Sequence, residues 1–446
     1  MTVAFRYWRL QRRAPGKRPP SEVEWDRAHA KTGAAVYGLA TKLGGAFVKM
    51  GQVLGSRGDV LPEALVAPLR GLHDRVPSRP LGKLQKHLEQ QLWLAAQWEI
   101  AARPIDNSRA FEDNDRSANQ HPSSSRGHVV DRAGRRPLSK VFSEVEPTAI
   151  AAASLAQVHR GKLLDGTEVA IKIQYPEVRK LFPIDFGSFR RAVRVARWLN
   201  KSLDLRPLVD ELAHFVLLEL EFSRELISTK RCRENLKDDA TVVVPEIHEE
   251  LSTDKLLVLG FIKGTALTRL EVLRERGVDL REIANRVASL YATMIFSHGF
   301  FHGDPHPGNI LVLDDGRLGL LDFGLAKELP EGFAANAARM IAAGMAGDTA
   351  KAVEAARAIG FVISEAKAPL LLSMIKALLG DYREAGDVLK QLAPGELEIP
   401  HHFTLIGRVM IILSGVSHSL VPNERIIGRA LLVALAPHMM VVRSAS

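Results

Sequence analysis

Three residues with oxygen-bearing side chains, Asp304, Asn309 and Asp322, stand out by their spacing in the stretch FHGDPHPGNILVLDDGRLGLLDFG, residues 301–324. Asp304 is followed by Asn309, and Asp322 comes later in Asp-Phe-Gly. Because glycine and proline interrupt HGDPHPGN, no regular helix can form there, and Asp304 and Asn309 are predicted to lie on a structured loop. The residues that follow read as a β-hairpin with its turn at Asp-Asp-Gly, which would return Asp322 to the side of Asn309.

Such a cluster is suited to phosphoryl transfer. Mg²⁺ takes a few hard oxygen ligands and leaves its other positions to water and phosphate, so Asn309 and Asp322 are the predicted metal ligands. Asp304 would orient or deprotonate an acceptor hydroxyl. Each aspartate alone would more often cap a turn or a helix. The combination of Asp-x4-Asn with a later Asp-Phe-Gly favours the chemical interpretation.

A lysine on a predicted strand would complete the phosphate site. In EVAIK, residues 168–172, alternation directs Ala170 and Lys172 to the same face. A lysine that holds the α- and β-phosphates needs a helix-borne carboxylate to fix it. The predicted helix LLELEFSRELI offers three: Glu219, Glu221 and Glu225. A lone strand lysine is usually a surface residue, but the order of these residues along the chain favours the phosphate lysine.

The segment before this strand resembles a phosphate-binding loop without its glycines. Alanines and a serine stand where glycines would normally be: Ala151, Ala152, Ala153 and Ser154. Alanine largely excludes positive φ angles and adds a methyl group. We therefore expect a stiffer loop with an altered fit to phosphates. Taken by itself, the segment is a weak motif that small-residue packing would also explain.

Five segments are predicted along the chain. They are a disordered basic tail (1–20), an N-terminal helical extension (21–92), a polar disordered insert (93–136), a strand-rich lobe (137–262) and a mainly helical lobe (263–446). Gly44, Gly45 and Gly51 would weaken a helix in the extension, which indicates close packing or a functional approach. The fold class is therefore α+β with two lobes.

Within the strand-rich lobe, residues 148–175 read as two strands joined by a turn at 164–167. A helical region follows over roughly 185–238. TVVVPEI and KLLVLGFI read as two further strands.

Composition is that of a soluble globular protein. The formal net charge is +9, which suits an anionic partner or simply a basic solvated surface. The single cysteine, Cys232, excludes an intrachain disulfide and a cysteine-rich zinc site, so a reducing, cytoplasmic location is expected. No apolar run is expected to reach the ~18 residues of a membrane span. The basic tail carries aromatic residues and offers a means of peripheral membrane contact.

Taken together, the motifs resemble those of the UbiB/AarF family of atypical kinases. The matching pieces are KMGQ (49–52), AAAS (151–154), VAIK (169–172), ELEFSRE (219–225), HGDPHPGN (302–309) and LDFG (321–324). The resemblance implies a protein-kinase-like fold, with a small β-rich N-lobe, a helical C-lobe and an N-terminal helical extension that carries the KxGQ motif. The alternatives are a pseudokinase that uses nucleotide as a switch and a small-molecule kinase of the aminoglycoside or choline type.

The resemblance also implies roles for single residues. Lys172, paired with Glu225, would bind ATP together with the 151–154 loop, and Asp304 would be catalytic. Asn309 and Asp322 would hold Mg²⁺. Lys49 and Gln52 would form a regulatory face over the active site, able to pair with Glu219 and Glu221. The family usually has Glu-x-Asp where this chain has Glu-Leu-Glu, which lengthens the reach of the second carboxylate.

Function and partners follow from the same resemblance. It implies ATP-dependent, Mg²⁺-dependent chemistry in support of quinone or other isoprenoid-lipid metabolism. The expected partners are a nucleotide, a lipid or isoprenoid small molecule, and a membrane surface contacted peripherally. No nucleic-acid partner is expected.

Overall fold

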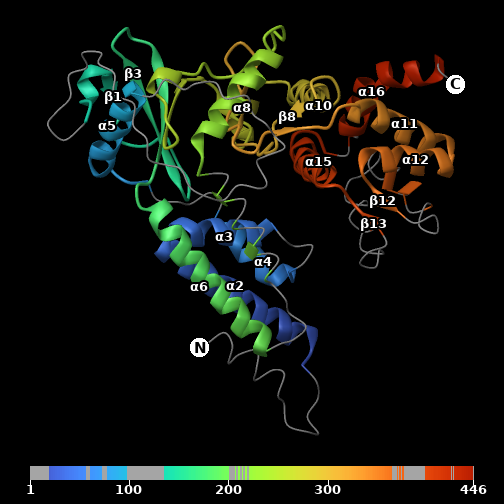
Figure 1. Ribbon diagram of the computed structural model, residues 1–446, viewed down its shortest axis with the longest axis horizontal. Helices are drawn as coiled ribbons and strands as arrows, with labels where there is room; N and C mark the ends of the chain where they lie inside the picture. Colours follow the sequence, from blue (N-terminus) through green and yellow to red (C-terminus); the bar gives the residue numbers. More distant parts are fainter. Residues whose placement is uncertain are drawn as a thin grey trace. The chain divides into compact units, whose positions relative to one another are not determined.

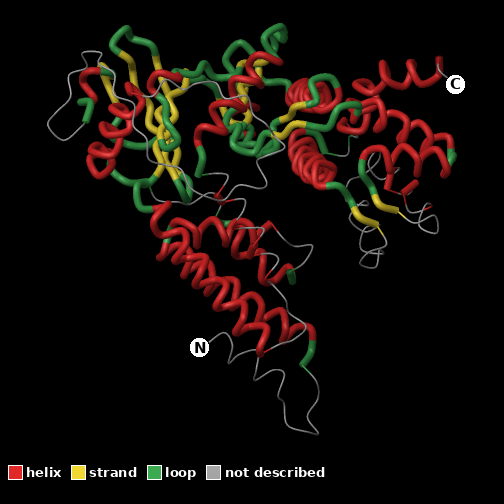
Figure 2. The backbone as a smooth tube through the Cα atoms, viewed as in Figure 1, coloured by secondary structure: helices red, strands yellow, loops and turns green. Residues whose placement is uncertain are grey.

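The computed structural model describes residues 20–56, 61–72, 78–97, 135–199, 220–363, 397–422 and 426–444, with residue 424 and isolated residues between 206 and 217 and between 369 and 375. It forms two compact units (Figures 1 and 2). Unit 1 comprises residues 1–224 and 247–261, and unit 2 comprises residues 225–246 and 262–446. The predicted boundaries put residues 225–246 in the strand-rich lobe. They group with unit 2 because strand β5 (Val242–Val243) pairs there with β10 (Leu318–Leu320).

Unit 1 is built on an antiparallel sheet in the order β1-β3-β4-β6, with β2 paired to β3. Its strands are β1 (Phe142–Val145), β2 (Ala151–Ala152), β3 (Ala156–Leu163), β4 (Glu168–Gln174) and β6 (Leu256–Gly260). The predicted hairpin is confirmed, since β3 and β4 pair along their lengths and Leu163 N–H donates to the Thr167 carbonyl at 2.9 Å. The strand predicted from KLLVLGFI is β6, which pairs with β4.

Unit 1 contains helices in the segment predicted as a helical extension and, in addition, one helix after β4. They are α2 (Glu22–Leu43), α3 (Gly45–Ser56), α4 (Glu63–Arg70), α5 (Leu81–Gln97) and α6 (Val178–Leu199), with short 3₁₀ turns η1 (Leu138–Lys140) and η2 (Glu249–Leu251). The expected insert from residue 93 begins too early, because α5 continues to Gln97 and buries Ala95. Residues 1–19 and the insert between 98 and 134 lie outside the described residues.

Two glycines of the extension serve close helix packing. A Cβ at Gly51 would lie 2.2 Å from Leu72 Cδ1, and a Cβ at Gly33 would lie 2.3 Å from the Leu65 carbonyl oxygen. Gly44 and Gly45 have φ angles of 68° and 48° at the break between α2 and α3. Packing and chain reversal therefore account for these glycines.

Unit 2 is mainly helical. Its helices are α9 (Leu270–Glu275), α10 (Leu280–Phe296), α11 (Phe333–Ala346), α12 (Thr349–Ile359), α15 (His401–Leu420) and α16 (Ile426–Ser444), and α8 (Phe222–Asn235) joins the two units in sequence. The remaining strands are β7 (Thr265–Ala266), β8 (Phe300–Phe301), β9 (Ile310–Val312), β11 (Lys327–Glu328), β12 (Val362–Ile363) and β13 (Leu397–Glu398). Helix α10 has ten buried side chains and contacts α15 and α16 (Figure 1).

Helix α15 is long and apolar enough to cross a membrane by length and composition alone. The expectation that no segment reaches this length is therefore wrong. Its Val409 and Leu413 side chains belong to the hydrophobic core of unit 2. Because a core helix passes the same test, no membrane span is inferred.

A buried polar network ties the strands of unit 1 together. His159 is fully buried, and its Nδ1 donates to the Glu146 carbonyl at 2.8 Å, since a carbonyl can only accept. Its Nε2 then accepts from the Gln157 side-chain amide at 2.6 Å. Gln157 also exchanges two 2.8 Å hydrogen bonds with the backbone of Arg79 and accepts from the Tyr175 hydroxyl at 3.2 Å. Every polar atom of this network is satisfied only if His159 is neutral.

This network predicts a loss of stability in mild acid. Burial lowers the pKa of His159, and the same cause lowers the pKa of His29, His87, His298 and His402. The unfolded chain then binds more protons than the folded one below pH ~6.5, so the free energy of unfolding falls as pH decreases from about 7. In His159→Asn the amide can still donate to Glu146 but does not titrate. Denaturant unfolding at several pH values should show a shallower pH dependence than in the wild type, and an unchanged slope would contradict this assignment.

Candidate active site

The loop between β8 and β9 brings Asp304 and Asn309 together. Asn309 Nδ2 donates to Asp304 Oδ2 at 3.1 Å and to the Asp304 carbonyl at 3.2 Å. Both acceptors are oxygens, so the amide orientation is fixed by chemistry. Asn309 Oδ1 is then the atom directed away from these two contacts, and it is the oxygen that a metal ion could use.

The hairpin that follows returns the chain to the same place, as predicted. Strands β9 and β10 pair antiparallel, and Leu321 N–H donates to the Asn309 carbonyl at 2.8 Å. The next residue, Asp322, is exposed and has a φ of 61°, the one positive φ at a non-glycine residue in the described part of the chain. A strained backbone of this kind persists only where the surroundings enforce it, and it marks functional positions.

Glu225 lies close to the Asp-Phe-Gly turn. It stands in the first turn of α8, and its side chain is buried. A Cβ on Gly324 would lie 3.3 Å from Asp322 Oδ1 and 3.8 Å from Glu225 Oε2. The carboxylates of Asp322 and Glu225 thus both lie close to Gly324, and hard oxygens of this kind are the ligands that Mg²⁺ prefers. The predicted pairing of Glu225 with Lys172 stays a prediction.

Two further residues of this site were not found from the sequence. His302 is buried, with its Nε2 2.9 Å from the Leu321 carbonyl and its Nδ1 3.1 Å from the Tyr291 hydroxyl of α10. The Asp304 N–H also points to His302 Nδ1, at 3.2 Å. His302 stands within the HGD motif, which was a usable signal, whereas Tyr291 sits in an apolar helix pattern that indicates only core packing.

Arg408 was also missed. It extends from α15, and its Nη2 lies 3.9 Å from Asp304 Oδ1 with its side chain about half exposed, at 47%. Nothing in the sequence around Arg408 marks it, because α15 follows Asp304 only after several intervening elements. The structure thus places a cation beside the predicted catalytic carboxylate.

Lys172 lies on β4 in unit 1, in the orientation that the alternation predicted. Val169, Ile171 and Ile173 enter the core that α5 covers, while Ala170 and Lys172 share the other, partly exposed face. The Lys172 ammonium is 5.3 Å from the centroid of the Phe222 ring, at the first residue of α8. This distance is within the range of a cation–π contact.

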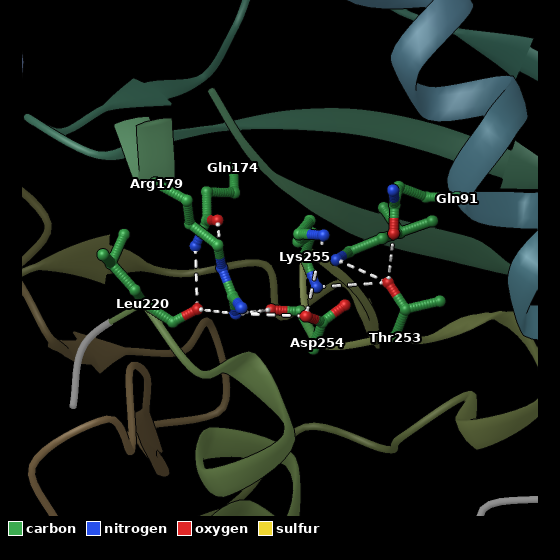
Figure 3. A network of polar contacts seen from close by, with 8 residues as sticks. Gln91, Gln174, Arg179, Leu220, Thr253, Asp254 and Lys255 are labelled. Carbon is green, nitrogen blue, oxygen red and sulfur yellow. Dashed lines mark hydrogen bonds and ion pairs between the residues drawn. The ribbon is translucent and has the colours of Figure 1, made fainter. Parts of the chain in front are cut away.

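A polar network holds the end of β4 to the chain just before α8 (Figure 3). The buried Gln174 side chain donates to the Leu220 carbonyl at 2.9 Å, and Arg179 donates to the same oxygen at 2.8 Å. Arg179 also pairs with Asp254 at 3.1 Å. Phe222 N–H donates to the Asp254 carbonyl at 3.2 Å. These contacts hold the start of α8 beside Gln174 at the end of β4. Gln174 is two residues beyond Lys172 on the same strand.

The alanine-rich segment forms a tight hairpin. Ala151 and Ala152 make up β2, and Ala153 N–H donates to the Ala156 carbonyl at 2.8 Å across the turn. Ser154 is buried, whereas Ala151 and Ala153 are exposed. None of these residues has a positive φ, which agrees with the expectation for alanine. Their contact with a nucleotide stays a prediction.

The structure modifies the predicted regulatory face. Gln52 of α3 donates to the Leu72 carbonyl at 3.0 Å, so it fastens α3 to the end of the α4 segment, and Lys49 lies one turn earlier on α3.

Of the glutamates predicted to pair with this face, Glu219 lies outside the described residues. In the predicted helical region over roughly 185–238, residues 220 and 221 are not helical, and α8 begins after them at Phe222. Glu221 is therefore an exposed residue before α8 rather than a helical one.

The donor set of unit 2 agrees with a magnesium site that a nucleotide completes. No three His, Cys, Asp or Glu side chains cluster as a metal site in the part of the chain that the structure describes. The predicted ligands Asn309 and Asp322 supply one amide and one carboxylate. Mg²⁺ is commonly held by one or two carboxylates with substrate phosphates and water, so the residues fit this ion.

Comparison with known proteins identifies the class. A sequence model of the ABC1 atypical kinase-like domain matches residues 115–356, and the chain belongs to this family. An uncharacterized protein of Synechocystis, slr1919, is 29% identical over 87% of this chain and 64% of its own length. ACTIVITY OF BC1 COMPLEX KINASE 3 of Arabidopsis thaliana, designated chloroplastic, is 30% identical over 66% of this chain and 36% of its own. AarF domain-containing protein kinase 1 of Gallus gallus is 28% identical over 77% of this chain and 60% of its own.

A solved structure shows the same fold. The complex of Rv3197 with erythromycin from Mycobacterium tuberculosis superposes with a TM-score of 0.52, at 25% identity over 67% of this chain and 79% of that one. The UbiB/AarF resemblance and the kinase-like α+β fold are therefore confirmed. The chain spans between about one third and two thirds of the length of the first curated relatives.

The site geometry predicts a severe defect in Gly303→Ala. A Cβ at Gly303 would lie 2.0 Å from the Leu325 carbonyl oxygen, so the loop that carries Asp304 or the segment after Asp322 must shift. A shift of about 1 Å is expected to lower turnover roughly 100-fold. Steady-state ATP hydrolysis and thermal unfolding measure the effect.

The matched control for this substitution is Gly415→Ala on α15, where an added Cβ meets nothing within 4 Å. An alanine there should leave activity unchanged and stabilise the helix by roughly 0.5–1 kcal/mol. Wild-type turnover in Gly303→Ala would show that the close approach to Leu325 is not needed.

Proposed function

We propose that the protein is an ATP-binding, Mg²⁺-dependent kinase or ATPase. The proposal rests on two contacts that bring Asp304, Asn309 and Asp322 together. The Asn309 side chain donates to the Asp304 carboxylate, and the N–H of Leu321, the residue before Asp322, donates to the Asn309 carbonyl. Membership of the ABC1 family supports kinase-like chemistry. The presence of Lys172, Asp304, Asn309 and Asp322 favours turnover over a pure nucleotide switch.

Each residue then has a defined task. Bound ATP and Mg²⁺ supply the phosphoryl group and neutralise its negative charge. Asn309 Oδ1 and the Asp322 carboxylate would hold the ion, and Lys172 would hold the α- and β-phosphates. Asp304 would orient the attacking hydroxyl or water and accept its proton. The strained φ of Asp322 presents its carboxylate while Phe323 stays buried in the core.

The biological setting that we propose is quinone or other isoprenoid-lipid metabolism, with peripheral contact to a membrane surface. The family resemblance supports it, and the net charge of +9 suits an anionic surface. Liposomes with and without anionic lipid, added to the ATPase assay, test it. Stimulation or flotation specific to anionic vesicles would support the setting, and indifference to both would remove it.

Three substitutions test the enzymatic proposal. Asp304→Asn should lower turnover by roughly 10²–10⁴-fold with little change in ATP affinity, because it removes the proton acceptor. Lys172→Ala should weaken ATP binding. Asp322→Asn should weaken Mg²⁺ binding, so that a higher Mg²⁺ concentration is needed for half-maximal activity. Titration of ATP and Mg²⁺ with single-turnover hydrolysis separates binding from chemistry.

Matched controls come from the same hairpin and from the neighbouring strand β3. Asp315→Asn changes an exposed aspartate in the turn of the β9–β10 hairpin, and Lys162→Ala removes a strand lysine paired only with exposed Glu144. Both should behave as wild type. ATP binding without hydrolysis in the wild type would favour the pseudokinase switch, and rapid transfer to an amino alcohol or sugar would favour a small-molecule kinase.

A further inference from the structure

Tyr291 carries a hydroxyl into the core of unit 2. Its side chain is fully buried on α10, and the hydroxyl lies 3.1 Å from His302 Nδ1. Burial, and then the charge of nearby Asp304, raise the pKa of Tyr291 well above its usual value. The hydroxyl therefore keeps its proton and is available as a donor. A tyrosine that served only to fill space would need no such partner, since phenylalanine fills nearly the same volume.

The contacts of His302 fix its protonation and orientation. Nε2 faces the Leu321 carbonyl at 2.9 Å, and a carbonyl only accepts, so Nε2 carries the proton. Nδ1 is therefore unprotonated in the neutral ring. It accepts from the Tyr291 hydroxyl and from the Asp304 N–H, at 3.1 and 3.2 Å. The ring also stands edge-on to Phe323, with centroids 5.0 Å apart.

We propose that Tyr291 is a positioning residue for the phosphoryl-transfer site, and this proposal rests on the proposed function. Its hydroxyl holds His302 in the Nε2–H tautomer and in one ring orientation. His302 then fixes the backbone of Asp304 at one nitrogen and the backbone of Leu321, next to Asp322, at the other. The Nδ1–H tautomer would present a proton to the Asp304 N–H and to the Tyr291 hydroxyl, and it would leave the Leu321 carbonyl without a donor.

The substitution Tyr291→Phe removes the hydroxyl and keeps the ring. We expect kcat for ATP hydrolysis to fall roughly tenfold, because Asp304 is less well held, while the KM for ATP changes less than about twofold. A packing defect alone would lower thermal stability without this separation of kcat from KM.

The matched control is Tyr175→Phe in unit 1. Tyr175 is also buried, and its hydroxyl donates one hydrogen bond, to Gln157 at 3.2 Å. The Tyr175→Phe variant should lose about as much thermal stability as Tyr291→Phe, while its kcat stays at the wild-type value. Equal kcat in Tyr291→Phe and wild type would overturn the proposal, as would equal losses of kcat in both tyrosine variants.

Nitrogen NMR of ¹⁵N-histidine-labelled protein provides a second readout that needs no activity. The signal of His302, assigned by its absence in His302→Asn, should show protonated Nε2 and unprotonated Nδ1 in the wild type. In Tyr291→Phe the Nδ1 shift should change, and the amide signal of Asp304 should move with it. Unchanged shifts of both groups would overturn the positioning role.

The two readouts also separate this proposal from the function on which it rests. If the wild type hydrolyses no ATP and transfers no phosphate, the proposed function fails, and the histidine and amide shifts alone decide whether Tyr291 positions the loop. If the wild type is active, both the kcat effect and the spectral change must appear in Tyr291→Phe.

Discussion

The candidate site of unit 2 depends on one buried imidazole that accepts and donates at the same time. His302 joins α10, the loop of Asp304 and the chain entering Asp322 through three hydrogen bonds at its two ring nitrogens. A buried polar ring would be costly if any of these partners were missing. The requirement to satisfy it forces three separate segments of the chain, at Tyr291, Asp304 and Leu321, to keep one arrangement. The geometry of the candidate site therefore follows from the need to satisfy a polar group in the core.

Close contacts around this ring explain why the motif is so rich in special residues. Gly303 leaves room for the Leu325 carbonyl oxygen, and no larger residue could stand there without displacement. Asp322 adopts a left-handed backbone while Phe323, the next residue, is buried. Such strain lasts only because the β9–β10 hairpin and the core hold the chain on both sides. The residues of the candidate site and those that permit the turn are interleaved in one short segment.

Much of this arrangement could be predicted from the sequence because it is local. The Asp-Asp-Gly turn and the strands beside it determine the hairpin that brings Asn309 to Leu321. The alternation in EVAIK determines the face of Lys172. Helix ends were less predictable. Polar residues after Leu92 suggested an insert, but burial of Ala95 extends α5, and the backbone carbonyl of Asp254 receives the N–H that begins α8 at Phe222.

Tyr291 and Arg408 could not be predicted, because their roles depend on tertiary contacts. Tyr291 follows the apolar period of α10 and differs from a core residue only by its hydroxyl. Arg408 belongs to α15, which lies beyond the residues matched by the family model, whereas Asp304 lies within them. The Arg408 guanidinium lies 3.9 Å from Asp304 Oδ1, so it competes with any other cation or hydrogen-bond donor that approaches this carboxylate. Arg408 is half exposed, so this contact is also open to solvent. The helix that brings a cation to Asp304 thus lies outside the matched domain, while Asp304, Asn309 and Asp322 lie inside it.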